Sequence, residues 1–278
     1  MAFDVKTFTT RTITASIFVA VLLSCILFHA VSFTMLFLII SIWGLYEFYI
    51  LSERLGAKPY KWLGYLLALF IYVYNLLSYN TLLSTTSLLA AIIVCVFLVF
   101  IQALFDTDEH SFKNITYTLT GVMYAVIPFV LLNKIAAVDI TSQINYNPHY
   151  VLGIILLIWT NDVCAYLVGS FFGKHKLFER VSPKKTWEGT VGAAILTIGA
   201  SFLIAQWFDE LELVHWIVIA MLVSVFGTIG DLVESMFKRQ AGVKDSGKIM
   251  PGHGGILDRF DSLLFVSPFI FLYLSLFK

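Results

Sequence analysis

The sequence predicts an all-α polytopic integral membrane protein with about nine transmembrane helices. Three observations support this fold class. First, 59% of the 278 residues are hydrophobic and 13% are charged, and the mean hydropathy of +0.87 is too high for a soluble domain. Second, apolar stretches recur at roughly the 17 to 25 residues that a helix needs to cross the hydrocarbon core. Third, almost all Lys and Arg residues fall on one side of the resulting topology.

The apolar stretches define the expected helices in order. They cover residues 13–30, 33–51, 62–79, 82–104, 115–133, 150–168, 190–208, 214–230 and 260–277. The first two are so close in sequence that they must form a tight hairpin. Lys6 and Arg11 precede the first stretch, as in a signal peptide, but no cleavage site of small residues stands out. We therefore expect this stretch to remain as a membrane helix.

The positions of the basic residues predict the orientation. Nine crossings place the N-terminus and the loops after the second, fourth, sixth and eighth helices on one side of the membrane. That side holds 16 of the 18 Lys and Arg residues, and only Lys134 and Lys278 lie opposite. Because cytoplasmic loops carry the excess of basic residues, the N-terminus is expected in the cytoplasm, with the protein in the cytoplasmic (inner) membrane.

The two parts of the chain differ in their polar content. Residues 1–149 have short loops, and we expect them to support the bundle or mediate its association. Glu47 is their one carboxylate well inside a span, and it is given no role because its side chain can extend to the membrane surface. Residues 150–278 hold two polar cytoplasmic segments, 169–189 and 231–259. The active site is therefore expected in this C-terminal region, on the cytoplasmic side.

The segment GDLVESMFKR, residues 230–239, places several polar side chains on one helix face. Asp231, Glu234, Ser235 and Lys238 are spaced i, i+3, i+4 and i+7. A helix end that emerges into water, with solvated charge pairs, explains this segment alone equally well.

The segment LDRFDS, at the start of the last helix, adds Asp258 and Asp261. One of them is explained by the favourable interaction of a carboxylate with a helix N-terminus. All four carboxylates, however, would lie at the cytoplasmic ends of two adjacent antiparallel helices. They would repel one another without a cation between them, and hard oxygen ligands suit Mg²⁺.

A glycine-rich turn lies between these two acidic segments. Gly252, Gly254 and Gly255 let backbone N–H groups approach a ligand, and basic side chains nearby favour phosphate. The basic side chains are Lys238, Arg239, Lys244, Lys248, His253 and Arg259. Carboxylates for a metal and cations for phosphate are together typical of a metal-dependent phosphoryl or nucleotidyl transferase. His253 alone could equally form a backbone hydrogen bond in the loop.

The other polar segment, residues 171–192, contains SPKKTWEG. Ser182 is expected to cap a helix, with Pro183 in the first turn. Lys184 and Lys185 would then oppose the helix dipole unless an anion binds there. We prefer phosphate recognition to simple anchoring of the loop in the cytoplasm.

Asp162 lies within the span 150–168, where a carboxylate is costly. It should therefore face a polar cavity or pair with a cation. The alternative is a helix-packing hydrogen bond with the neighbouring Asn161.

The run SMFKRQAGVKDSGKIMPGHGGILDRFDS, residues 235–262, resembles the defining motif of the phosphatidate cytidylyltransferases, also called CDP-diacylglycerol synthases. That motif reads S-x-x-K-R-x4-K-D, a spacer, then P-x-H-G-G-x-x-D-R-x-D. Its fixed positions are Ser235, Lys238, Arg239, Lys244, Asp245, Pro251, His253, Gly254, Gly255, Asp258, Arg259 and Asp261. With NDVCAYLVGSFFGK and SPKKTWEG, the resemblance covers roughly residues 157–262.

The resemblance implies that CTP and phosphatidate react to give CDP-diacylglycerol and pyrophosphate, with Mg²⁺ as the cofactor. It also implies a homodimer in contact with membrane lipid and no nucleic-acid partner, and it leaves open whether a second cation binds. The preferred metal ligands are Asp231 and Asp258, with Asp261, Asp162 and Glu234 as further candidates. The assigned catalytic residues are Lys238, Arg239, His253 and Arg259, and the assigned substrate-binding residues are Ser182, Lys184, Lys185, Lys244, Gly254 and Gly255.

Two alternatives remain open from the sequence. A CTP-dependent kinase of a polyprenol or another lipid alcohol would need the same cation and phosphate groups. A cation-coupled transporter would need acidic residues within both halves of the chain, whereas the first half offers little beyond Glu47.

Overall fold

The computed structural model describes residues 5–78, 85–137, 146–247, 249 and 254–277. The chain divides into two compact units. The N-terminal unit comprises Met1–Lys134 and Gln240–Arg259, and the C-terminal unit comprises Ile135–Arg239 and Phe260–Lys278. The described residues of the segment 240–259 thus pack with the N-terminal helices. The assignment of support to residues 1–149 and of catalysis to residues 150–278 stays a prediction.

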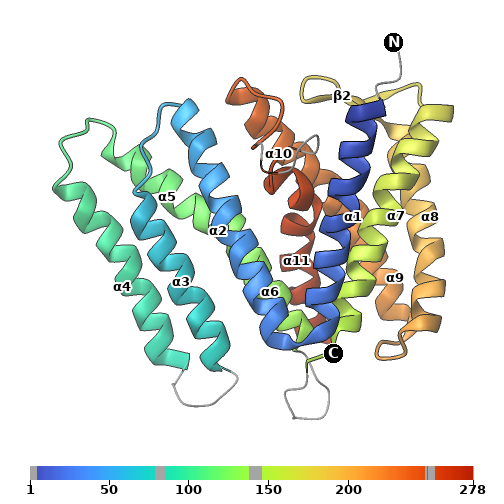
Figure 1. The fold of residues 1–278 in the computed structure, drawn as a ribbon, viewed down its shortest axis with the longest axis horizontal. Coiled ribbons are helices and arrows are strands. Elements are labelled where there is room, and N and C mark those ends of the chain that lie inside the picture. The colour runs from blue at the N-terminus through green and yellow to red at the C-terminus, as the bar shows by residue number, and fades with distance from the viewer. Residues whose placement is uncertain (1–4, 79–84, 138–145, 248, 250–253, 278) are drawn as a thin grey trace. The chain divides into compact units, whose positions relative to one another are not determined.

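The N-terminal unit is a set of antiparallel helices, in which α2 packs on α1, α3 and α5, and α4 packs on α3 and α5 (Figure 1). These helices are α1 Val5–Phe28, α2 Ala30–Arg54, α3 Lys61–Ser78, α4 Thr85–Leu104, α5 Ser111–Ala125 and most of α6 Ile127–Ala136. The helices α1 and α2 form the predicted hairpin, with His29 between them.

Glycines allow the helices of this unit to pack closely around Tyr49 of α2. A Cβ atom on Gly64 of α3 or Gly121 of α5 would clash with the Tyr49 ring. The Tyr49 hydroxyl donates a 3.0 Å hydrogen bond to the carbonyl of Thr118 on α5. The α5–α6 break follows from Pro128, which has no N–H and whose ring crowds the preceding turn.

The C-terminal unit contains the remaining elements. They are α7 Pro148–Phe172, β1 Lys176–Phe178, β2 Ser182–Thr186, α8 Trp187–Trp207, α9 Leu213–Leu222, the π-helical turn η1 Val223–Gly227, α10 Thr228–Gln240 and most of α11 Leu257–Phe277. The most extensive contact joins α7 to α8. A Cβ atom on Gly189 of α8 would lie 3.0 Å from the Cα of Gly169 on α7. Small residues thus bring the two backbones together, as is typical of membrane helices.

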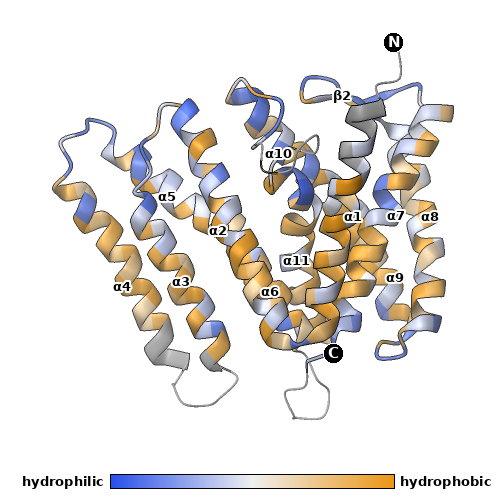
Figure 2. Cartoon of the chain, in the orientation of Figure 1, coloured by the Kyte–Doolittle hydropathy of each residue, from blue (hydrophilic) through white to orange (hydrophobic). Residues whose placement is uncertain are grey.

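The hydropathy of the helices confirms an integral membrane protein built of helices. Within the described residues, six helices are long and apolar enough to cross a membrane: Ala30–Arg54, Ser111–Ala136, Pro148–Phe172, Trp187–Trp207, Leu213–Gln240 and Leu257–Phe277. Three shorter apolar helices, Thr12–Phe28, Lys61–Leu76 and Leu89–Leu104, overlap the other predicted spans. Figure 2 shows long hydrophobic stretches along these helices. The count of nine crossings stays a prediction.

The structure corrects the prediction of a helix that begins at Ser182. Residues 182–186 form β2, which pairs antiparallel with β1 in a short hairpin within the otherwise α-helical fold. Helix α8 begins at Trp187, and its N-cap is Thr186, whose Oγ1 accepts a 3.2 Å hydrogen bond from the N–H of Gly189. In the strand, Lys184 and Lys185 avoid the unfavourable helix dipole that the predicted first turn would have imposed.

Candidate active site

Three carboxylates meet in the C-terminal unit. Asp231 and Glu234 lie on α10 and Asp261 lies on α11, and one oxygen of each lies within 4.8 Å of the others. Glu234 is 1% exposed, whereas Asp231 and Asp261 are partly exposed. The i, i+3 spacing therefore places Asp231 and Glu234 on one face of α10. Asp261 of the last helix lies beside both of them.

Two local features of the backbone bring these helices together. A Cβ atom on Gly230 would lie 2.6 Å from the carbonyl oxygen of Asp261, so only glycine allows this approach. The π-helical turn η1 precedes α10, and its last carbonyl, at Gly227, accepts a 3.2 Å hydrogen bond from Ser262 Oγ. Such π-helical turns change the direction of the residues that follow and are frequent at functional sites.

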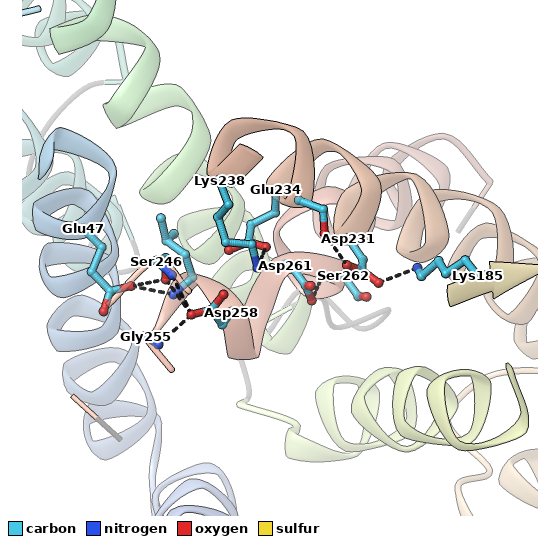
Figure 3. A network of polar contacts seen from close by, with 12 residues as sticks. Glu47, Lys185, Asp231, Glu234, Lys238, Ser246, Gly255, Asp258, Asp261 and Ser262 are labelled. Atoms are coloured by element: carbon cyan, nitrogen blue, oxygen red, sulfur yellow. Dashed lines mark hydrogen bonds and ion pairs between the residues drawn. The ribbon is translucent and has the colours of Figure 1, made fainter. Parts of the chain in front are cut away.

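Basic and hydroxyl groups surround the acidic cluster (Figure 3). Lys185 of β2 forms an ion pair with Asp231, and Lys238 of α10 forms one with Glu234. Ser235 Oγ donates a 3.2 Å hydrogen bond to Asp231. Lys185, which was predicted to bind substrate, thus contacts a predicted metal ligand, and Lys238 is 8% exposed beside another.

Asp162 of α7 belongs to the same electrostatic environment. The charges of Lys185 and Asp231 both act on Asp162, and those of Asp231, Asp162 and Lys185 act on Asp261, but the ion pair of Lys185 is with Asp231. The expectation that Asp162 faces a polar cavity or pairs with a cation stays a prediction. Its role as a metal ligand stays a prediction.

The donor chemistry of this cluster fits a divalent cation. Three carboxylates within 4.8 Å supply hard oxygen ligands of the kind that Mg²⁺ prefers. Lys185 and Lys238 offset two of the three negative charges. The remaining negative charge favours a cation at the cluster.

Asp258, in contrast, organises the loop of the N-terminal unit. Its Oδ2 atom accepts hydrogen bonds from the N–H of Ser246 at 2.8 Å, from Ser246 Oγ at 3.0 Å and from the N–H of Gly255 at 2.7 Å. Gly254 has a φ of 82°, and a Cβ atom there would lie 2.5 Å from this same oxygen. The conformation and the space both require glycine. The predicted meeting of Asp258 with Asp231 stays a prediction, since the two residues belong to different units.

Sequence reasoning missed Glu47, which is 2% exposed and fixes the same loop. Its carboxylate accepts hydrogen bonds from the N–H of Ile256 at 2.9 Å, the N–H of Leu257 at 3.0 Å and Ser246 Oγ at 2.8 Å. These amides open α11, so Glu47 caps a helix more than 200 residues away in sequence. The only signal in the sequence was a carboxylate inside an apolar span.

Ser246 links the two carboxylates of this loop. Its hydroxyl lies 2.8 Å from Glu47 Oε2 and 3.0 Å from Asp258 Oδ2. A hydroxyl has one proton to donate, so it serves one carboxylate at a time. The backbone N–H groups of the loop supply the other donors (Figure 3).

The other predicted site residues are distributed as follows. Lys244 is exposed and lines a pocket of the N-terminal unit, whereas Gly255 is buried against Glu47 and Ser246. Lys184, Arg239 and Arg259 are exposed. His253, with Lys248, Pro251 and Gly252, lies outside the described residues. The catalytic and substrate-binding roles of all these residues stay predictions.

The fold and the cluster define an integral membrane protein with an acidic cluster where two of its helices meet. Comparison with known families gives a more specific answer. The sequence matches the model of the cytidylyltransferase family over residues 9–277. The chain therefore belongs to the cytidylyltransferase family.

Individual relatives agree with this assignment. The chain is 39% identical over 184 residues to the phosphatidate cytidylyltransferase of Staphylococcus saprophyticus. The aligned region covers 66% of this chain and 67% of the relative. A protein of the same name from Staphylococcus aureus strain COL has the same identity and coverage. The relative of that name from Staphylococcus haemolyticus is 38% identical over the same lengths.

Proposed function

We propose that the protein transfers the cytidylyl group of CTP to phosphatidate, giving CDP-diacylglycerol and pyrophosphate for phospholipid biosynthesis. The observation that supports this most is the cluster of Asp231, Glu234 and Asp261 in a chain of the cytidylyltransferase family. The name of the relatives, phosphatidate cytidylyltransferase, supplies the substrate. Phosphatidate and CTP are both anions, so the acidic cluster would act on them through a bound cation.

The reaction needs positioning and charge neutralisation more than a strong base. A phosphate oxygen of phosphatidate attacks the α-phosphorus of CTP, and a new P–O bond forms. The bond from that phosphorus to the bridging oxygen of the β-phosphate breaks, and its electron pair leaves with pyrophosphate. A phosphate monoester is largely ionised near neutral pH, so the nucleophile needs no proton removed. Both reactants are anions, so cationic groups lower the barrier.

The acidic cluster would hold Mg²⁺ through Asp231, Glu234 and Asp261. When bound, the ion supplies positive charge for the phosphates of CTP. The chain's own residues set the charge of the site: Lys185 lies against Asp231, and the nearly buried Lys238 lies against Glu234. Arg239 and Arg259 are exposed and are proposed to contact substrate phosphates.

The location and assembly of the protein are part of the same proposal. The basic residues on one side of the predicted topology support a cytoplasmic membrane location, with the N-terminus and the active site facing the cytoplasm. A homodimer is proposed from the family resemblance. The substrates CTP and phosphatidate would meet at that membrane surface.

Incubation of the purified protein with CTP, phosphatidate and Mg²⁺ tests the function. Mass spectrometry is expected to detect CDP-diacylglycerol, and release of pyrophosphate should equal its amount. EDTA should abolish both products, and added Mg²⁺ should restore them. If phosphatidate were returned unchanged while CTP was consumed, the proposed reaction would be wrong.

A further inference from the structure

A partly open pocket of about 630 Å³ lies within the N-terminal unit. One wall is a single face of α2, and the other is formed by the loop residues 243–247 and Ile249. Its volume falls in the range of roughly 300 to 1,000 Å³ that is typical of small-molecule sites. None of the residues of the acidic cluster in the C-terminal unit lines this pocket.

The wall on α2 changes from apolar to basic along the helix. Trp43, Tyr46, Ile50 and Arg54 line it, and their spacing of three or four residues places them on one helix face. At 1.5 Å per residue, Trp43 lies about 16 Å along the helix axis from Arg54. The Trp43 and Tyr46 side chains are 42% and 44% exposed, so both rings are accessible to a ligand.

The basic end of the pocket is suited to an anion. Arg54 and Lys244 both line it, and both are exposed. Within the described parts of the chain, neither forms an ion pair with a carboxylate. Asp245 contributes one opposing charge, whereas the Glu47 carboxylate is directed to Ser246 and the start of α11. Two cations against one accessible carboxylate leave the site positively charged.

Glu47 also fixes the geometry of this pocket. It lines the pocket, and its hydrogen bond to Ser246 holds the loop wall against α2. The loop wall carries Lys244, which is adjacent to the residues that Glu47 and Asp258 hold. The position of the Lys244 cation relative to α2 is therefore set by buried hydrogen bonds.

We propose that this pocket binds the phosphate headgroup of phosphatidate, with Arg54 and Lys244 at the phosphate and Trp43, Tyr46 and Ile50 along the glycerol and the upper acyl chains. This inference rests on the proposed function and adds the place where the lipid substrate is held. A lipid must leave its chains in the membrane, and α2 is a candidate membrane span. The apolar part of the wall, from Trp43 to Ile50, is about 10 Å long, and CTP has no acyl chain to lie along it.

Kinetics in mixed micelles test the assignment. Arg54→Gln and Lys244→Gln should each raise the KM for phosphatidate, as a surface mole fraction, about tenfold, because a charge-assisted hydrogen bond to phosphate is lost. The KM for CTP should not change. Lys58→Gln is the matched control, because Lys58 pairs with Asp108 and does not line the pocket. A raised KM for CTP alone would assign the pocket to the nucleotide, and unchanged constants would show that it holds neither substrate.

A binding measurement tests the lipid in this pocket independently of the enzyme activity. Phosphatidate with brominated acyl chains should quench the fluorescence of Trp43, which is obtained as the difference between the wild type and Trp43→Phe. Brominated diacylglycerol, which has no phosphate, should quench it less, and Arg54→Gln should remove that difference. Equal quenching by both lipids would mean that Trp43 only faces bulk lipid, and the inference would be overturned. A wild type that shows headgroup-dependent quenching but makes no CDP-diacylglycerol would instead contradict the proposed function.

Discussion

Removal of the Glu47 carboxylate should release the start of α11. The carboxylate accepts hydrogen bonds from the N–H groups of Ile256 and Leu257, and these two residues are 6% and 1% exposed. A buried donor that loses its partner costs about 1 to 3 kcal/mol. Two orphaned amides in Glu47→Ala should therefore lower the free energy of local opening by about 3 kcal/mol, which corresponds to about 100-fold faster exchange.

Hydrogen–deuterium exchange of the amides of residues 254–258 is the assay, because exchange reports local opening. Glu47→Gln keeps one carbonyl oxygen and should give an intermediate increase of about tenfold, as one of the two amides keeps its acceptor. Glu53→Ala is the matched control, since Glu53 lies on the same helix but is exposed and pairs with Lys61. Wild-type exchange in Glu47→Ala would contradict the capping role of Glu47, because other contacts would then hold the loop.

Three further predictions concern the C-terminal unit. Asp261→Asn should lower turnover at limiting Mg²⁺ by about 100-fold or more with unchanged circular dichroism, because a charged ligand is lost; near wild-type turnover would remove Asp261 from the metal site. Gly230→Ala should reduce the free energy of unfolding in detergent by about 1 to 3 kcal/mol, because its Cβ would overlap the Asp261 carbonyl. Gly199→Ala has no atom within 4 Å of its new Cβ and should not destabilise, so equal effects of the two glycine variants would contradict the packing argument. Thr186→Ala should weaken the first turn of α8 by about 1 kcal/mol, measured by hydrogen exchange, because the N-cap hydrogen bond is lost. Ser182→Ala should have no such effect. If only Ser182→Ala weakened this turn, the helix would begin at Ser182.

The helices were predictable because their signal is local. The length of each apolar run predicts the length of one helix. The i, i+3 spacing of Asp231 and Glu234 places them on a common face of α10. Hydropathy also indicated that polar residues gather near the ends of the last helices, which brought Asp261 into the candidate set. The ion pair of Lys185 with Asp231 was not predictable in this way, because it joins a strand to a helix far along the chain.

The pairing of β1 with β2 and the role of Glu47 could not be predicted from local patterns. Ser182 followed by Pro183 satisfies the rules for a helix start, but Thr186 satisfies the N-cap role as well and does so without two lysines in the first turn. Glu47 is isolated in an apolar span, and its partners are backbone N–H groups more than 200 residues away. Every residue except proline has a backbone N–H, so the identities of residues 256 and 257 do not indicate these hydrogen bonds.

The fate of each phosphate of CTP distinguishes cytidylyl transfer from the transfer of a single phosphate. CTP labelled at the α-phosphate in one sample and at the γ-phosphate in another is incubated with the purified protein, phosphatidate and Mg²⁺. We predict that the α-label enters the lipid as CDP-diacylglycerol and that the γ-label leaves as pyrophosphate. Transfer of the γ-label to a lipid, with CDP as the nucleotide product, would contradict this prediction and identify a CTP-dependent lipid kinase.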